Sequence, residues 1–193
     1  MKVSREQAAL NRERVVEVAA KLFREKGFDG IGVADLMKGA GLTHGGFYGQ
    51  FGSKEDLLVE ACGKALEGSL AGWSRLAVGT PREQLGKIVG SYLSPAHRAN
   101  PGKGCSMTTL AADAPRVGPA VRQTLTQGAR AQIGMLTELH GKLDPDAAPD
   151  EQRRRAIAAY AGMVGAMMLA RAVEDEALSD EILETVKAAL GAG

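Results

Sequence analysis

Apolar residues recur at three- and four-residue spacings through most of the chain, and alternating stretches of β-branched residues are nearly absent. In the first long segment, Val15, Ala19 and Phe23 share one helical face. Asn11 is the expected N-cap of this helix, and Gly27 is expected just after its end at residue 26. Further helices are expected at 33–38, 43–49, from 53 to about 73, from 80 onward, and at 105–112, 117–142, 151–175 and 180–190. The pattern predicts an all-α protein.

The spacing of the helix breaks changes along the chain. Before residue 53 the expected helices are short and separated by glycines, and after it they are longer and more apolar. Ser53 is the expected N-cap of the helix that joins the two parts, with Asp56 in the capping-box position. We therefore expect a domain at 1–60 and a second helical domain at 61–193, a division within the ordinary range of domain sizes.

Composition and charge exclude several classes of protein. The net charge of +1 gives no global basic field, although residues 1–54 carry nine Lys and Arg against six Asp and Glu. No apolar run approaches the ~18 residues of a membrane span, and the first 16 residues lack the continuous apolar core that a signal peptide requires. Two cysteines make no disulfide framework, so the cytoplasm is the expected compartment. The histidines lack metal-ligand spacing, and neither metal nor cofactor is expected.

The short helices at 33–38 and 43–49, with a glycine-containing turn between them, fit a helix-turn-helix. The second helix would be the recognition helix, whose N-terminal residues contact base edges in the major groove. Gly45 and Gly46 each cost a helix about 1 kcal/mol relative to alanine, so we interpret them as letting the backbone approach DNA. His44, Tyr48 and Gln50 are then the side chains able to reach the duplex. A plain helical hairpin is the alternative interpretation.

Two stretches and their spacing, RERVVEVAAKLFREKGFDG and VADLMKGAGLTHGGFYGQFGSKEDLL, resemble the TetR family of bacterial repressors. The resemblance covers residues 8–65 closely, and beyond them it extends only to the helical layout. It implies a homodimeric repressor that binds a palindromic double-stranded operator and is released by a small-molecule effector. The effector would bind in the C-terminal domain.

Carried over by position, the resemblance assigns roles to six residues near the turn. The first four fall where the family reads bases or approaches the groove, namely Thr43, His44, Gly45 and Gly46. Tyr48 and Lys54 fall on positions where the family contacts phosphates. The chain departs from the family in carrying Ile31 and Gly32 where a Thr/Ser pair is usual. Gln50 stands where the family often has histidine, and glutamine can still reach a phosphate or an adenine edge.

The helix expected at 151–175 contains a stripe of small and flexible residues at three- and four-residue steps, namely Ala159, Gly162, Met163, Ala166 and Met167. The family resemblance implies that the last two helices form a dimer interface that includes this stripe, and plain core packing is the alternative. Bulky or adaptable residues are the candidates for lining an effector pocket, although each could equally belong to an ordinary core. They are Trp73, Tyr92, Met107, Leu110, Met135 and Tyr160.

Cys105 follows a glycine break at the start of an expected helix and lies two residues from Lys103. A helix N-terminus and a nearby cation both favour the thiolate, so Cys105 is a candidate redox or effector-responsive site. A small buried residue is the alternative, and we expect that role for Cys62. A helical-bundle enzyme with Cys105 as nucleophile is the rival functional class, but the helix-turn-helix favours a regulator that is not an enzyme.

Overall fold

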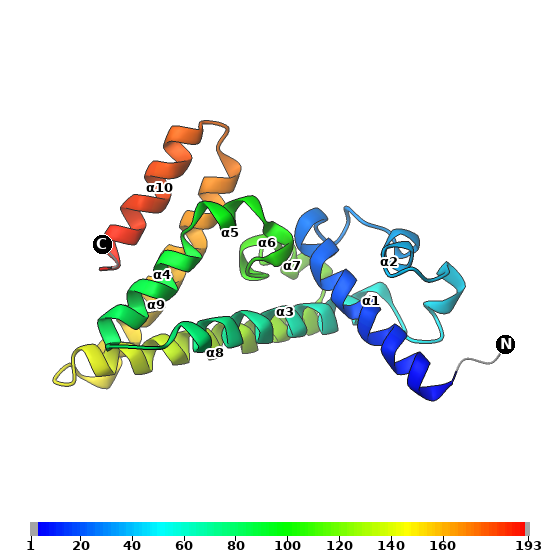
Figure 1. The fold of residues 1–193 in the computed structure, drawn as a ribbon, viewed down its shortest axis with the longest axis horizontal. Coiled ribbons are helices and arrows are strands. Elements are labelled where there is room, and N and C mark those ends of the chain that lie inside the picture. Colours follow the sequence, from blue (N-terminus) through cyan, green and yellow to red (C-terminus); the bar gives the residue numbers. More distant parts are fainter. Residues whose placement is uncertain (1–3, 192–193) are drawn as a thin grey trace. The chain divides into compact units, whose positions relative to one another are not determined.

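The computed structural model describes residues 4–191, which form helices and no strands (Figure 1). The all-α prediction is confirmed. By its contacts the chain divides into two compact units. Unit 1 comprises Met1–Glu67 and Pro101–Thr126, and unit 2 comprises Gly68–Asn100 and Gln127–Gly193. The expected domain boundary after residue 60 stays a prediction, and the contacts group a second stretch, 101–126, with the first unit.

Unit 1 is built from the long helix α1, several short helices and the first parts of two further long helices. Its elements are α1 (Arg5–Lys26), α2 (Val33–Gly39), the 3₁₀ helix η1 (His44–Gly46), the start of α3 (Lys54–Leu76), the 3₁₀ helix η2 (Pro101–Lys103), α6 (Met107–Leu110), α7 (Ala114–Val117) and the start of α8 (Pro119–Leu143). The sequence analysis missed η2 and α7. The expected helix at 105–112 shrinks to the single turn of α6.

The first helix begins earlier than expected. Ser4 is its N-cap, and the Ser4 hydroxyl accepts a hydrogen bond from the Gln7 backbone N–H at 3.1 Å. Asn11 lies inside the helix, where its side chain accepts from the Gln7 amide at 3.0 Å, so the predicted start was wrong. Gly27 follows the helix as predicted, with a φ of 74° that favours glycine. Serine and asparagine are both good caps, and the sequence alone could not choose between them.

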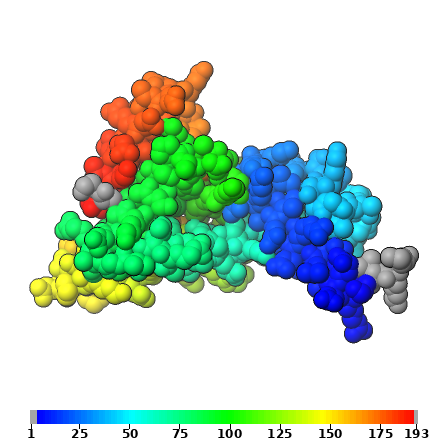
Figure 2. All heavy atoms as spheres, viewed as in Figure 1, coloured from blue at the N-terminus to red at the C-terminus, as the bar shows by residue number. Residues whose placement is uncertain are grey.

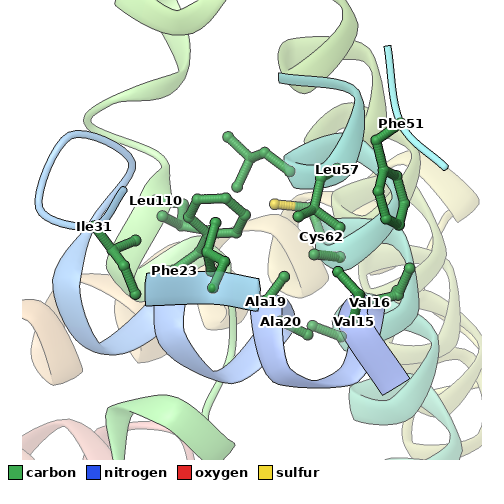
Figure 3. Close-up of a cluster of buried hydrophobic side chains, with 14 of the residues drawn as sticks. Val15, Val16, Ala19, Ala20, Phe23, Ile31, Phe51, Leu57, Cys62 and Leu110 are labelled. Carbon is green, nitrogen blue, oxygen red and sulfur yellow. The ribbon is translucent and has the colours of Figure 1, made fainter. Parts of the chain in front are cut away.

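Unit 1 has one continuous apolar core, to which α1 and α3 contribute the largest share (Figure 3). Phe23, Leu57 and Leu36 are fully enclosed in it. The stretch after residue 100 contributes Leu110, Ala114 and neighbouring side chains to the same cluster. This shared burial explains why 101–126 belongs to unit 1, because apolar area removed from water is the main driving force for such packing.

Unit 2 contains the end of α3, then α4 (Pro81–Tyr92), α5 (Pro95–Ala99), the rest of α8, α9 (Pro149–Ala172) and α10 (Glu176–Ala189). Thr80 caps α4 in a full capping box with Glu83, as its sequence pattern indicates. Helix α9 begins two residues before its expected start, and α10 begins four residues before its expected start. The short α5 was missed by the sequence analysis.

Candidate nucleic-acid interface

The helix-turn-helix predicted from sequence is present in unit 1. The turn after α2 is closed by the Leu42 N–H, which donates to the Met37 carbonyl at 2.9 Å. Gly41 has a φ of 70°, a conformation that suits glycine. Phe47 and Phe51 are buried in the core and stack with ring centroids 5.5 Å apart. The two phenylalanines therefore anchor the recognition segment, defined as residues 43–51, to the rest of unit 1.

The recognition segment differs from the prediction in its secondary structure. Only His44–Gly46 is helical, and it is a 3₁₀ turn rather than an α-helix over 43–49. Most of its backbone hydrogen bonds span three residues, such as Gly46 N–H to the Thr43 carbonyl and Phe47 N–H to the His44 carbonyl. Three glycines in this short stretch lower the helix propensity, which is the physical reason for the irregular form.

Side chains on one side of the recognition segment are open to solvent. Thr43 and His44 are exposed, and Tyr48 is 68% exposed, which is high for an aromatic residue. The Tyr48 ring makes edge contacts with His44 at 6.0 Å and with Phe47 at 5.2 Å between centroids. These contacts support the ring, and the large exposed fraction of Tyr48 suits a hydrogen bond from its hydroxyl to a phosphate.

The paired glycines are not required by the fold. A Cβ atom at Gly45 would meet nothing within 4 Å, and one at Gly46 would make ordinary contact with the Met37 methyl at 3.6 Å. Neither residue has a positive φ. The interior of unit 1 would therefore accept alanine at both positions, and the reason for glycine must lie outside the packed chain or in the flexibility of the segment.

Two further predicted DNA contacts are engaged within the chain. The Gln50 amide donates to the Gly46 carbonyl at 3.2 Å, and its side-chain oxygen is buried, so Gln50 braces the recognition segment. The Lys54 ammonium donates to the Phe28 carbonyl and lies 4.2 Å from the centroid of the Phe28 ring. Burial lowers the pKa of Lys54. The ammonium keeps two more hydrogens that could meet a phosphate.

The start of α2 lacks the hydroxyl that the family resemblance would place there. Ile31 is buried in the core of unit 1, and Gly32 is the N-cap without a side-chain hydrogen bond. The start of α3 keeps its cap, since the Ser53 hydroxyl accepts from the Asp56 N–H at 3.0 Å. Of the two neighbouring helix starts, only that of α3 is capped by a side chain.

The pocket candidates fall into separate places. Trp73, Tyr92 and Tyr160 are buried together in unit 2, with Trp73 making edge contacts with both tyrosines at 6.0 and 6.2 Å. Met107 and Leu110 instead pack in the core of unit 1. Met135 is half-buried on α8.

Unit 1 has a surface cavity of about 550 Å³ between α1 and α3. None of the six pocket candidates lines it. Its charged side chains include Arg12, which pairs with Glu60, and Lys64, which pairs with Glu13 at 3.1 Å. Because these charges already neutralise one another across the two helices, we assign the cavity no ligand.

The expected dimer interface stays a prediction, but most of its residues are buried within this chain. Four of its five residues are buried inside this chain, with Met163 and Met167 fully enclosed, and Gly162 is only half-buried. The apolar residues left exposed lie at other positions of the same two helices, namely Ile157, Met168, Leu169 and Leu178. A stripe at helical spacing identifies a packed face, but it cannot tell the inner face from an outer one.

Neither Cys62 nor Cys105 forms a disulfide, and both are buried. Cys105 precedes α6, which has only four residues, so the helix start expected to favour its thiolate is a single turn. Its carbonyl accepts the Thr108 hydroxyl at 2.8 Å. Burial among apolar residues raises the pKa of Cys62 to about 12, which fits the structural role expected for it, and Figure 3 shows this side chain within the core of unit 1.

An all-helical chain that presents a helix-turn-helix from a small apolar core belongs to the class of helix-turn-helix proteins. Residues 15–61 match the family model described as bacterial regulatory proteins, tetR family. An uncharacterised helix-turn-helix transcriptional regulator of Bacillus subtilis, YerO, is 32% identical over 90 residues. That match covers 42% of this chain and 29% of the relative, less than a third of its length.

Solved structures extend the likeness over nearly the whole chain. A TetR regulator from Chloroflexus aurantiacus is 26% identical, with a TM-score of 0.79 over 96% of this chain and 94% of the other. The reduced form of NemR from Escherichia coli is 24% identical, with a TM-score of 0.79 over 93% and 94%. A TetR-family regulator from Agrobacterium tumefaciens is 20% identical, with a TM-score of 0.79 over 94% and 98%. Residues 15–61 thus match the tetR family of bacterial regulatory proteins in sequence, and nearly the whole chain is similar in fold to TetR-family regulators.

Two further features concern membranes and metal ions. Between residues 4 and 191 no helix combines the length and the apolar character needed to span a membrane. Over the same residues, His, Cys, Asp and Glu side chains form no group of three or more placed to bind a metal ion.

Proposed function

We propose that this chain is a repressor that binds a palindromic operator as a homodimer and releases it in response to an effector. The observation that carries the proposal is the exposed side of the recognition segment. It presents Thr43, His44 and Tyr48 to solvent beside a bare backbone at Gly45, while Phe47 and Phe51 anchor the segment in the core. Bare backbone permits close approach to a groove, and the flanking side chains supply hydrogen bonds.

The residues of the interface would divide into two roles. His44 and Thr43 would contact base edges, and Tyr48 and Lys54 would bind phosphates, which carry no sequence information directly. Gln50 would act at most indirectly, because its amide is engaged by the Gly46 carbonyl. This division makes different substitutions separable in a binding experiment.

The test is selection of bound duplexes from a random pool, followed by affinity measurements on the selected sequence at several salt concentrations. Tyr48→Phe and Lys54→Ala should weaken binding to all sequence variants about equally, while His44→Ala should change base preference. Phosphate binding also demands a steep fall of affinity with salt. A flat salt response, or a changed base preference with Lys54→Ala, would contradict the assignment.

The homodimer would use the apolar face that the chain leaves exposed on α9 and α10. Ile157 is 43% exposed, Leu169 57% and Leu178 43%, and the atoms of this helix pair, in orange and red, reach the surface in Figure 2. Removing such a face from water is the driving force for stable association. A dimer would also present two recognition segments to the two halves of a palindrome.

Leu169→Asp should give a folded monomer, because the charge falls on an exposed position of the proposed interface. Val78→Asp is the matched control, since Val78 is 64% exposed in the loop before α4, away from that face in sequence. Sedimentation and operator affinity should change together for Leu169→Asp and stay unchanged for Val78→Asp. A Leu169→Asp protein that remains dimeric would remove the proposed interface.

Release would follow either from a small molecule bound in unit 2 or from modification of Cys105. The aromatic group of Trp73, Tyr92 and Tyr160 supports the first route, since ligand sites in helical domains are lined by such side chains. Cys105 is 3% exposed, so a reagent would reach its thiol only when α6 opens locally. Alkylation with iodoacetamide of the native protein and of Cys105→Ser, followed by operator binding, separates the routes. Equal release from both proteins would exclude Cys105 as the trigger.

A further inference from the structure

The adjacent glycines at 45 and 46 face different environments. Gly45 is exposed, and a Cβ there would point into open space. Gly46 is half-buried, and a Cβ there would lie 3.6 Å from the Met37 methyl, which is an ordinary packing distance. Gly49 also has room, because its nearest neighbour to a Cβ would be the Gly46 carbonyl oxygen at 3.9 Å. Packing therefore explains none of the three glycines.

Backbone conformation does not explain them either. All three have ordinary φ values, since the positive-φ glycines of the described chain are at other positions. What the glycines do change is the helix propensity of the segment, by about 1 kcal/mol each. The recognition segment accordingly forms only the 3₁₀ turn at His44–Gly46, with three-residue hydrogen bonds that are weaker in geometry than those of an α-helix.

We propose that Gly46 and Gly49 hold the recognition segment short of an α-helix in the free protein, and that operator DNA completes the helix. The proposal rests on the DNA-binding function above and adds a conformational step to it. Gly45 has the separate role of leaving its exposed side bare for close approach of the duplex. The anchors Phe47 and Phe51 keep the segment attached to the core while its backbone changes.

Completing the helix only on DNA lowers the operator affinity, and substitutions that change the helix propensity of the segment should therefore change that affinity. When only a fraction of the free protein has the binding-competent conformation, the apparent dissociation constant rises by the inverse of that fraction. Alanine in place of one glycine would raise the helical fraction by up to about fivefold, which corresponds to about 1 kcal/mol. In a dimer with two recognition segments the two factors multiply, to about 25-fold at most.

The experiment compares operator affinity for three glycine-to-alanine variants of the full chain. Gly46→Ala should bind the selected duplex up to about 25-fold more tightly, with an unchanged salt slope because no phosphate contact is added. Gly45→Ala gains the same propensity but places a methyl on the exposed side, so it should bind more weakly than the wild type. Gly86→Ala is the control for general stabilisation. Gly86 lies inside α4 with no atom within 4 Å of a Cβ, so this variant should leave the affinity unchanged.

Amide hydrogen exchange on the free proteins gives a readout that needs no DNA. Peptides covering residues 43–51 should exchange more slowly in Gly46→Ala than in the wild type, and Gly49→Ala should show the same change if Gly46→Ala folds poorly. Equal exchange in all proteins, unchanged or weaker DNA binding by Gly46→Ala, or equal tightening by Gly86→Ala would each overturn the proposal. Tighter binding by Gly45→Ala would overturn the separate roles of the two glycines. Failure of the wild type to bind any duplex would instead overturn the proposed function itself.

Discussion

The interiors of the two units hold their polar groups in different ways. In unit 1, Arg24 donates to the Gly102 and Gly104 carbonyls and Lys54 donates to the Phe28 carbonyl. In unit 2, Arg171 likewise donates to the His97 and Arg98 carbonyls, but Tyr160 also donates to the Gln132 side chain, which donates to Ser69. Both units thus use charge-assisted bonds to backbone carbonyls, and unit 2 adds a chain of hydrogen bonds between neutral side chains.

The two units also differ in the side chains whose protonation can change their stability with pH. Arginine stays protonated throughout the range in which proteins fold, even where burial lowers its pKa as it does for Arg24. Unit 2 holds His97 and His140, whose pKa values are lowered mainly by burial. The lowered pKa values of these two histidines therefore make the stability of unit 2 depend on pH below neutrality, and four experiments test how the units differ.

The largest effect is expected from Arg24→Met. The Arg24 guanidinium bonds the Gly102 carbonyl at 2.5 Å and the Gly104 carbonyl at 3.2 Å, and its loss leaves both without this partner. We expect a loss of about 3 kcal/mol in the free energy of unfolding, measured with urea. Lys21→Met is the control, because Lys21 is exposed and only 3.8 Å from Glu25, and it should change stability by less than about 0.5 kcal/mol. Equal effects of the two substitutions would contradict the contrast.

Breaking the polar chain of unit 2 should have a smaller and reversible effect. Tyr160→Phe removes the hydroxyl that donates to the side-chain amide oxygen of Gln132 at 2.5 Å. The buried amide oxygen is then left unpaired, at a cost of about 2 kcal/mol in the free energy of unfolding. Adding Gln132→Leu should recover most of that loss, because an apolar pair needs no partner and half-buried Ser69 can bond water. A double-mutant cycle on unfolding free energies measures the coupling. Additive losses would show that the two side chains do not act as a pair.

Helix α3 offers a comparison within a single element, because one end lies in each unit. Ser53→Ala removes the cap on the Asp56 N–H at its start and should cost about 1 kcal/mol. Ser74→Ala, near its other end, removes only a bond to the Leu70 carbonyl one turn back, and alanine has the better helix propensity. Thermal unfolding should therefore show a lower midpoint for Ser53→Ala and an equal or higher one for Ser74→Ala. The reverse order would contradict the cap assignment.

The smallest effect is the pH dependence of stability. Burial lowers the pKa of His97, against the effect of its ring bond to the Tyr92 carbonyl at 2.7 Å, and the Arg171 charge lowers it further. The unfolded histidine has a pKa of about 6.5, so below that pH the unfolded chain binds protons more readily than the folded one. Stability should be full above about pH 6.5 and fall as the pH drops through the lower folded pKa.

The measurement is the urea midpoint at pH 5.5 and at pH 7.5. His97→Asn should reduce the difference between the two, because the amide keeps a donor for the Tyr92 carbonyl but does not titrate. A pH dependence unchanged by this substitution would remove His97 from the contrast between the units.

Local signals settled much of this protein from its sequence. The helical class, the capping box at Thr80, the glycine after α1 and the helix-turn-helix all follow from interactions within a few residues. The family resemblance had the same local basis, since its motifs lie within one stretch of about 60 residues. Such features survive without knowledge of distant contacts, because caps and turns are satisfied by neighbouring backbone groups.

The tertiary structure decided which faces are inside. Helical spacing located the stripe that contains Met163, but only the packing of α9 against the rest of unit 2 shows it to be core. Lys54 carried a phosphate-binding pattern, and the structure shows its ammonium bonded to the carbonyl of Phe28, 26 residues earlier. The position of Cys105 favoured a reactive thiol, yet that position gave no information about its burial. Each of these outcomes depends on residues brought together from distant parts of the chain, and the sequence pattern alone does not show which residues those are.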